Sequence, residues 1–169
     1  PDVEAGLIAT PSQRKAVGYV NDPTDRGGET KFGVAQKANP AVNVRELTWD
    51  QAKAVYKKSY WDAAKCGSLP PRYAALHFDI AVNHGVKRAN IFLQRALGVT
   101  DDGIIGPVTL AKAEQADVFK LCSQVCDQRK KYYEAIIAND KSQERFRKGW
   151  MRRADELRSF VGDPKNTFD

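Results

Sequence analysis

The segment from residue 16 to residue 33 holds the side chains best suited to chemistry in this chain of 169 residues. It combines the carboxylates Asp22, Asp25 and Glu29 with the hydroxyl of Thr30 and several glycines. Glycine and short polar side chains serve backbone geometry and hydrogen bonding, and a domain accepts their cost in core volume mainly at a site. We therefore expect this segment to bind a ligand or to cleave one.

The elements on either side of this segment predict how its side chains meet. Residues 10–13 have the form of a capping box with proline at the first helical position, so a short helix should run from Pro11 to about Val17 and end at Gly18. Turn signals between residues 19 and 32 predict an irregular loop or a small β-hairpin that folds back over the helix end. This arrangement would bring Asp25 and Thr30 near residue 16.

The rest of the chain is predicted to be a series of helices. A capping box at residues 48–51 begins a helix that runs to about residue 64, and Pro70 and Pro71 precede a helix from Arg72 to about Asn83. Glycine and proline then delimit a helix that ends before Gly98 and another that begins at Pro107. Two long helices follow, at about 117–138 and 142–161. The fold class is therefore mainly α.

The segment from Gly18 to Gly33 resembles the signature of glycoside hydrolase family 108, the N-acetylmuramidases of phage endolysins. That signature usually reads Glu-Gly-Gly-Tyr-x-Asn-Asp-Pro-x-Asp-x-Gly-Gly-x-Thr-x-x-Gly. Residues 78–85, 92–99 and 102–109 resemble the peptidoglycan-binding half that accompanies this family. The resemblance extends from about residue 10 to residue 160.

The resemblance implies a lysozyme-like helical fold with a small β-hairpin or irregular loop at the active site. It implies a catalytic segment at 1–84 and a peptidoglycan-binding segment at 85–169, packed as one body. The expected reaction is hydrolysis of the β-1,4 bond from N-acetylmuramic acid to N-acetylglucosamine in bacterial peptidoglycan. In the family a glutamate protonates the leaving oxygen, and by alignment Asp25 and Thr30 serve the opposite side. An inverting glycosidase places its two carboxyls roughly 6.5–9.5 Å apart, which leaves room for a water.

The sequence departs from the family at the position of the acid. Ala16 stands where the family has its glutamate, and Val17 replaces the first glycine. A methyl group transfers no proton, and general acid catalysis typically contributes roughly 10²–10⁴-fold, so the chain should be nearly inactive as written. Ala16 is either an engineered replacement or the mark of a natural pseudoenzyme that only binds glycan. Glu29 and Asp22 are the other carboxylates that could reach the same cleft.

Four side chains are predicted to contact the substrate: Tyr19, Glu29, Asn83 and His84. Tyr19 could stack on a sugar ring, although aromatic residues more often belong to the core. Glu29 could instead shape the hairpin by hydrogen bonding. Asn83 and His84 could bind acetamido or hydroxyl groups of the glycan, or they could be a helix cap and a solvated imidazole.

Charge and composition limit the partners. The net charge of +6 favours an anionic partner, here bacterial peptidoglycan glycan strands, with an anionic envelope surface as a second candidate. Nucleic acid is not expected, because the basic residues lie among acidic ones. On the last helix an apolar stripe should dock on the core, opposite a basic face of Arg147, Lys148, Arg152 and Arg158. The resemblance implies a phage-encoded chain that is made in the bacterial host and acts in the periplasm or cell wall, and we expect it to be a monomer.

Other chemistries have weaker support in the sequence. His77 and His84 lack the spacing and the third ligand of a zinc site, and residues 100–109 lack the ligands of a calcium loop, so no metal and no cofactor are expected. Cys66, Cys122 and Cys126 are expected to be buried thiols, and a Cys–His peptidase built on Cys66 lacks a local signature. The main alternative is a non-catalytic peptidoglycan-binding or secretion-assisting module.

Overall fold

The computed structural model describes residues 19–21 and 28–168, without the side chain of Val20. The chain divides into two compact units, residues 1–58 and residues 59–169. The predicted helix at residues 11–17, Ala16 and Asp25 lie outside the described residues. The domain boundary predicted from the family resemblance lies between residues 84 and 85. The boundary between the two compact units lies between residues 58 and 59.

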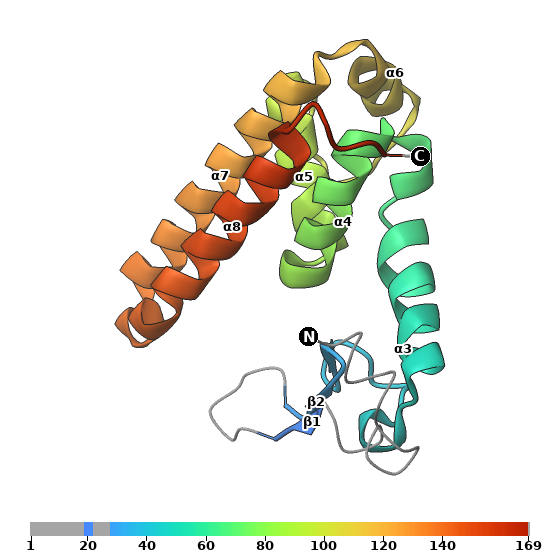
Figure 1. The fold of residues 1–169 in the computed structure, drawn as a ribbon, viewed down its shortest axis with the longest axis vertical. Helices are drawn as coiled ribbons and strands as arrows, with labels where there is room; N and C mark the ends of the chain where they lie inside the picture. The colour runs from blue at the N-terminus through green and yellow to red at the C-terminus, as the bar shows by residue number, and fades with distance from the viewer. Residues whose placement is uncertain (1–18, 22–27, 169) are drawn as a thin grey trace. The chain divides into compact units, whose positions relative to one another are not determined.

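A small antiparallel sheet forms the described start of the first unit (Figure 1). Strand β1 (Tyr19–Val20) pairs with β2 (Thr30–Lys31), which pairs with β3 (Val34–Ala35). Phe32 and Gly33 form the two-residue turn between β2 and β3 with φ of 51° and 77°, as type I′ hairpin turns require. A Cβ on Gly33 would lie 2.4 Å from the Tyr56 hydroxyl oxygen, so glycine also provides space there.

Two short helices complete the core of this unit. The 3-10 helix η1 spans Val44–Glu46, and helix α3 spans Trp49–Tyr56. The predicted capping box is confirmed: Gln51 N donates to Thr48 Oγ1 at 3.2 Å, and Thr48 N donates to Gln51 Oε1 at 2.9 Å. Val34, Val44, Leu47 and Ala52 are buried together, so the hairpin and α3 share one small core.

Helices make up the second unit. A π-helical segment, η2 (Lys57–Asp62), follows α3 in the chain and includes the division between the two units at residues 58 and 59. A 3-10 turn, η3, spans Cys66–Ser68. The α-helices are α4 (Pro71–His84), α5 (Val86–Leu97), α6 (Pro107–Gln115), α7 (Val118–Asn139) and α8 (Arg147–Gly162). Helices α7 and α8 lie side by side (Figure 1).

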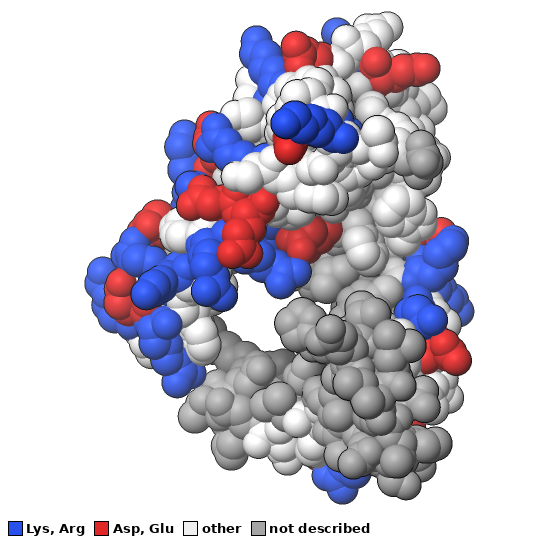
Figure 2. All heavy atoms as spheres, viewed as in Figure 1, with Lys and Arg blue, Asp and Glu red and all other residues white. Residues whose placement is uncertain are grey.

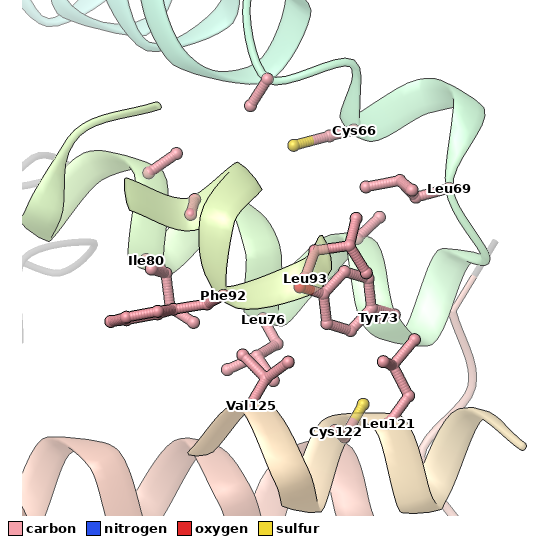
Figure 3. Packing of buried hydrophobic residues seen from close by; sticks show 14 of the residues in the cluster. Cys66, Leu69, Tyr73, Leu76, Ile80, Phe92, Leu93, Leu121, Cys122 and Val125 are labelled. Carbon is pink, nitrogen blue, oxygen red and sulfur yellow. The ribbon is translucent and has the colours of Figure 1, made fainter. Parts of the chain in front are cut away.

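The core of the second unit lies where α4, α5 and α7 meet. Tyr73 and Leu76 from α4 face Leu93 from α5, and Leu121 and other residues of α7 close the cluster (Figure 3). Further buried members are Cys66, Leu69, Ile80, Phe92, Cys122 and Val125. All three cysteines are free and buried, as predicted.

Most helix boundaries follow the punctuation of the sequence, but the helix predicted to run to about residue 64 changes from α-helical to π-helical after Tyr56. Pro71 begins α4, and Gly98 ends α5 in the left-handed conformation with φ of 68°. The predicted helix at 142–161 is partly wrong, because Lys141–Phe146 form a 3-10 helix, η4, before α8 begins at Arg147. Asp140 Oδ1 accepts a hydrogen bond from Ser142 N at 3.1 Å, and this cap tightens the first turn.

The last helix docks on the core by its predicted apolar stripe. Ala154 and Val161 are buried, and Leu157 packs against the core cluster. On the face formed by α7 and α8, acidic side chains lie among the basic ones (Figure 2). Arg147, Arg152 and Arg158 are ion-paired with Glu134, Glu156 and Asp127 respectively. Within the described ranges, no helix combines the length and apolar character that a membrane crossing needs.

Candidate functional site

The sheet of the first unit fixes Thr30 at the start of β2. Its backbone lies opposite Val20 of β1 and Ala35 of β3, so neighbouring strands hold it on both sides. The half-buried hydroxyl donates to Gly28 O at 3.3 Å. Because a hydroxyl has one proton and two lone pairs, Thr30 Oγ1 can still accept a hydrogen bond from a ligand or a water.

Two of the predicted substrate-binding residues share a single partner. Arg45 in η1 lies with Nη2 at 2.5 Å from Glu29 Oε1. The Glu29 carboxylate and then the Tyr19 hydroxyl, both by hydrogen bonding, raise the pKa of the Arg45 guanidinium. Arg45 therefore joins the first residue of β1 to the segment before β2, although 16 positions separate it from Glu29.

Glu29 also has a structural role in the hairpin. Its backbone carbonyl accepts from Gln36 N at 2.8 Å, and its side chain is only 26% exposed. A carboxylate in an ion pair with arginine acts as an acceptor, not as a proton donor. This geometry suits the hydrogen-bonding role considered for Glu29 better than the role of substitute acid.

Sequence reasoning missed Arg45 and Lys31. The Lys31 side chain is fully buried, and its Nζ donates to Arg45 O at 3.0 Å. A lysine inside a small core holds its neighbour by a charge-assisted hydrogen bond. No local sequence pattern predicts the contact of Arg45 with Glu29 or that of Lys31 with Arg45, because each joins residues far apart in the chain.

Asn83 and His84 belong to the second unit, at the end of α4. Asn83 is exposed, and its Nδ2 donates to Asp79 O at 2.7 Å, one turn earlier in the helix. The His84 ring is half-buried among Tyr132, Tyr133 and Phe92, with centroid distances of 5.3, 4.9 and 6.4 Å. It is therefore not a solvated imidazole.

The buried side chain of Arg129 determines which nitrogen of the His84 ring carries the proton. Arg129 Nε donates to His84 Nε2 at 3.3 Å, so this ring nitrogen is an acceptor and the proton belongs on Nδ1. Burial, and then the charge of Arg129, lower the pKa of His84 to about 4. His84 is thus neutral at pH 7 and has one N–H to donate.

The environment of Arg129 is unusual for a charged side chain. Arg129 is fully buried, and its Nη1 donates to Asp79 Oδ2 at 2.7 Å. Arg153 Nη2 lies 2.6 Å from the other oxygen of the same carboxylate. Arg129 Nη2 has no hydrogen-bond partner in the part of the chain that the structure describes. Two guanidinium groups thus share the carboxylate of Asp79, in the second half of α4.

The described residues contain no set of side chains that could bind a metal ion. Nowhere in 19–21 and 28–168 do three or more His, Cys, Asp or Glu side chains gather as a metal site would require. His77 is buried between Tyr73 and Asn90, hydrogen-bonded on both ring nitrogens. It is therefore engaged in the core.

A mainly helical chain with a small sheet before its helical unit has the architecture of lysozyme-like proteins. Residues 14–85 match the family model described as Glycosyl hydrolase 108, and residues 88–155 match the model described as Predicted Peptidoglycan domain. The chain thus combines a glycosyl hydrolase 108 domain with a peptidoglycan-binding domain.

A solved structure is similar to this chain over most of its length. The structure of Brucella abortus SagA aligns with a TM-score of 0.76 and 28% sequence identity, over 94% of this chain and 92% of that one. No protein among the curated ones matches this chain. The lysozyme-like helical fold predicted from the sequence is confirmed by this likeness.

Proposed function

We propose that this chain is an endolysin-type N-acetylmuramidase that acts on the β-1,4 bonds of bacterial peptidoglycan and carries Ala16 in place of its general acid. The observation that supports this most is the order of the two family matches, a glycosyl hydrolase 108 domain followed by a peptidoglycan domain. The first match spans residues 14–85 and so includes positions 16, 25 and 30.

Each site residue has a defined task in this proposal. Asp25 supplies the carboxylate that holds the attacking water, and Thr30 accepts a hydrogen bond on the same side of the sugar. Position 16 would donate a proton to the leaving oxygen, which alanine cannot do. Tyr19 and Glu29 bind the glycan, and Arg45 positions them. With Ala16 the chain retains binding and loses cleavage.

Restoring the acid tests this proposal. The Ala16→Glu variant should release reducing ends from purified peptidoglycan at least about 10²-fold faster than the chain as it stands, because a positioned acid typically contributes that much. Ala16→Gln is the matched control, since it has nearly the same shape as glutamate and cannot donate a proton from a carboxyl group. Equal rates for the three proteins would refute the missing-acid hypothesis.

The alternative function is a non-catalytic peptidoglycan-binding or secretion-assisting module. Ala16 itself favours it, because a chain without the general acid can still bind glycan but cannot protonate the leaving oxygen from that position. This alternative predicts sedimentation with cell walls and no new reducing ends from Ala16→Glu. Under either function, the proposed place of action is the periplasm or the cell wall, after synthesis of a phage-encoded chain in the bacterial host.

A further inference from the structure

A groove of about 510 Å³ lies in the second unit between the start of α5 and the loop that precedes α6. Val86, Lys87 and Asn90 line it from α5, and Asp102 and Ile104 line it from the loop. Lys65, from the segment before η3, also lines it. The groove involves none of the residues assigned above to catalysis or to glycan binding.

One buried side chain holds the loop in shape. Gln94 Nε2 lies 2.8 Å from Asp102 Oδ1 and 3.0 Å from Ile104 O, and Gln94 Oε1 accepts from Gly103 N at 2.8 Å. Lys65 Nζ adds a hydrogen bond to Ile105 O at 2.8 Å. A surface loop fixed by so many hydrogen bonds loses little entropy on binding, so the groove is pre-formed.

A chain of hydrogen bonds connects the groove to the core. The Tyr73 hydroxyl lies 3.2 Å from His77 Nδ1, and His77 Nε2 lies 3.1 Å from Asn90 Oδ1. Asn90 Nδ2 then donates to Gly103 O at 2.9 Å. Because an amide oxygen only accepts, His77 carries its proton on Nε2 and accepts from Tyr73. The floor of the groove thus has one defined arrangement of donors and acceptors.

The lining of the groove has the chemistry of a peptide site. Two lysines, Lys65 and Lys87, and a single carboxylate, Asp102, are the charged side chains that line it. Lys87 has no ion-pair partner among the residues that the structure describes, so its ammonium group is available to a ligand. Ile104 is 70% exposed beside these charges, and its backbone N donates to Asp102 Oδ1 at 2.9 Å. None of the lining residues is aromatic, whereas sugar rings are commonly held on aromatic faces.

We propose that this groove binds the peptide stem of peptidoglycan rather than its glycan strand. The stem carries carboxylates, which complement Lys87 and Lys65, and alanine methyl groups, which suit Ile104 and Val86. Its backbone amides can pair with the polar floor at Asn90 and Asp102. The inference rests on the proposed function, in which this half of the chain binds peptidoglycan, and it assigns the recognised part of that polymer.

Titration of the full chain with two probes separates peptide from sugar. The probes are a synthetic stem tetrapeptide of L-alanine, D-glutamate, a diamino acid and D-alanine, and a neutral chitin oligomer. The tetrapeptide should shift the NMR amide signals of Gly103 and Ile104, and the chitin oligomer should not. Lys87→Glu should weaken tetrapeptide binding roughly tenfold, because it replaces a charge-assisted contact with repulsion.

Matched variants test each contact. Lys131→Glu makes the same charge change on an exposed lysine of α7 that does not line the groove, and it should leave tetrapeptide binding unchanged. Ile104→Asn should weaken binding about fivefold through loss of apolar contact. Val108→Asn, at a side chain that is 68% exposed and outside the groove, should not.

The outcomes distinguish this inference from the proposed function. If about 10 mM tetrapeptide leaves both amides unshifted while the chain still sediments with intact peptidoglycan, the peptide site is wrong and the proposed function stands. Shifts caused by the chitin oligomer alone would overturn the inference in the same way. Failure of the chain to sediment with intact peptidoglycan would overturn both.

Discussion

At the scale of single residues, Arg129 places a full positive charge inside the second unit. Removing a guanidinium from water costs several kcal/mol unless it is paired, and its one carboxylate partner, Asp79, is shared with Arg153. Burial first, and then the charge of Arg129, explain why His84 stays neutral. Asn83 and His84 can therefore offer a glycan only N–H and carbonyl groups, with no charge of their own.

The two histidines of the chain make its stability dependent on pH. Burial is the main cause that lowers the pKa of both His77 and His84 from 6.5 to about 4. Between these values the unfolded state binds protons that the folded state does not. The free energy of unfolding should therefore fall as the pH drops from 6.5 to 4, by up to about 3 kcal/mol for each histidine.

Urea unfolding measured at several pH values from 7.5 to 4.5 tests this prediction. His84→Gln should flatten the profile by about 1.4 kcal/mol per pH unit within this window, because one proton fewer is taken up on unfolding. Most carboxylates titrate near or below pH 4.5 and contribute less there. A stability that stays constant from pH 6.5 to pH 4.5 would contradict the prediction.

At the scale of elements, the loop before α6 depends on Gln94 in α5. Gln94 is 1% exposed and contacts three residues of the loop, through one backbone N–H, one carbonyl and one carboxylate. Gln94→Ala should lower the free energy of unfolding by about 2–3 kcal/mol, since each lost hydrogen bond costs about 1 kcal/mol and a buried unpaired group costs more. Urea unfolding measures this loss.

The same substitution in another helix separates the effect on the loop from the effect of alanine on helix propensity. Gln124→Ala makes the same substitution at an exposed position of α7 and should change the stability by less than about 0.5 kcal/mol. Hydrogen exchange of the Gly103 amide, which donates to Gln94, should accelerate in Gln94→Ala. Unchanged exchange at Gly103 would show that the loop keeps its shape without Gln94.

At the scale of the whole molecule, the net charge of +6 should govern capture of the anionic wall polymer. Raising sodium chloride from about 20 to 300 mM shortens the screening length severalfold. Sedimentation with purified peptidoglycan should therefore weaken several-fold over that range. Binding of a neutral chitin oligomer is the control, and it should stay constant. An equal salt dependence for both ligands would contradict an electrostatic contribution to wall binding.

The sequence by itself determined the features that depend on neighbouring residues. The capping box at Thr48 and Gln51, the helix start at Pro71 and the helix end at Gly98 are local events, in which one side chain or one ring fixes the backbone beside it. The hairpin signature was equally local. By contrast, the predicted start of the last helix is wrong, because Asp140 caps a short 3-10 helix that precedes α8.

The tertiary structure alone decided which distant side chains meet. Arg45 reaches Glu29 across 16 positions, and Arg129 reaches Asp79 across 50. The groove joins Lys65 to a loop some 40 positions away, as its bond to Ile105 shows. Charge pairs of this kind leave no periodic signal in a sequence, because their partners are set by the packing of helices and not by spacing along one of them.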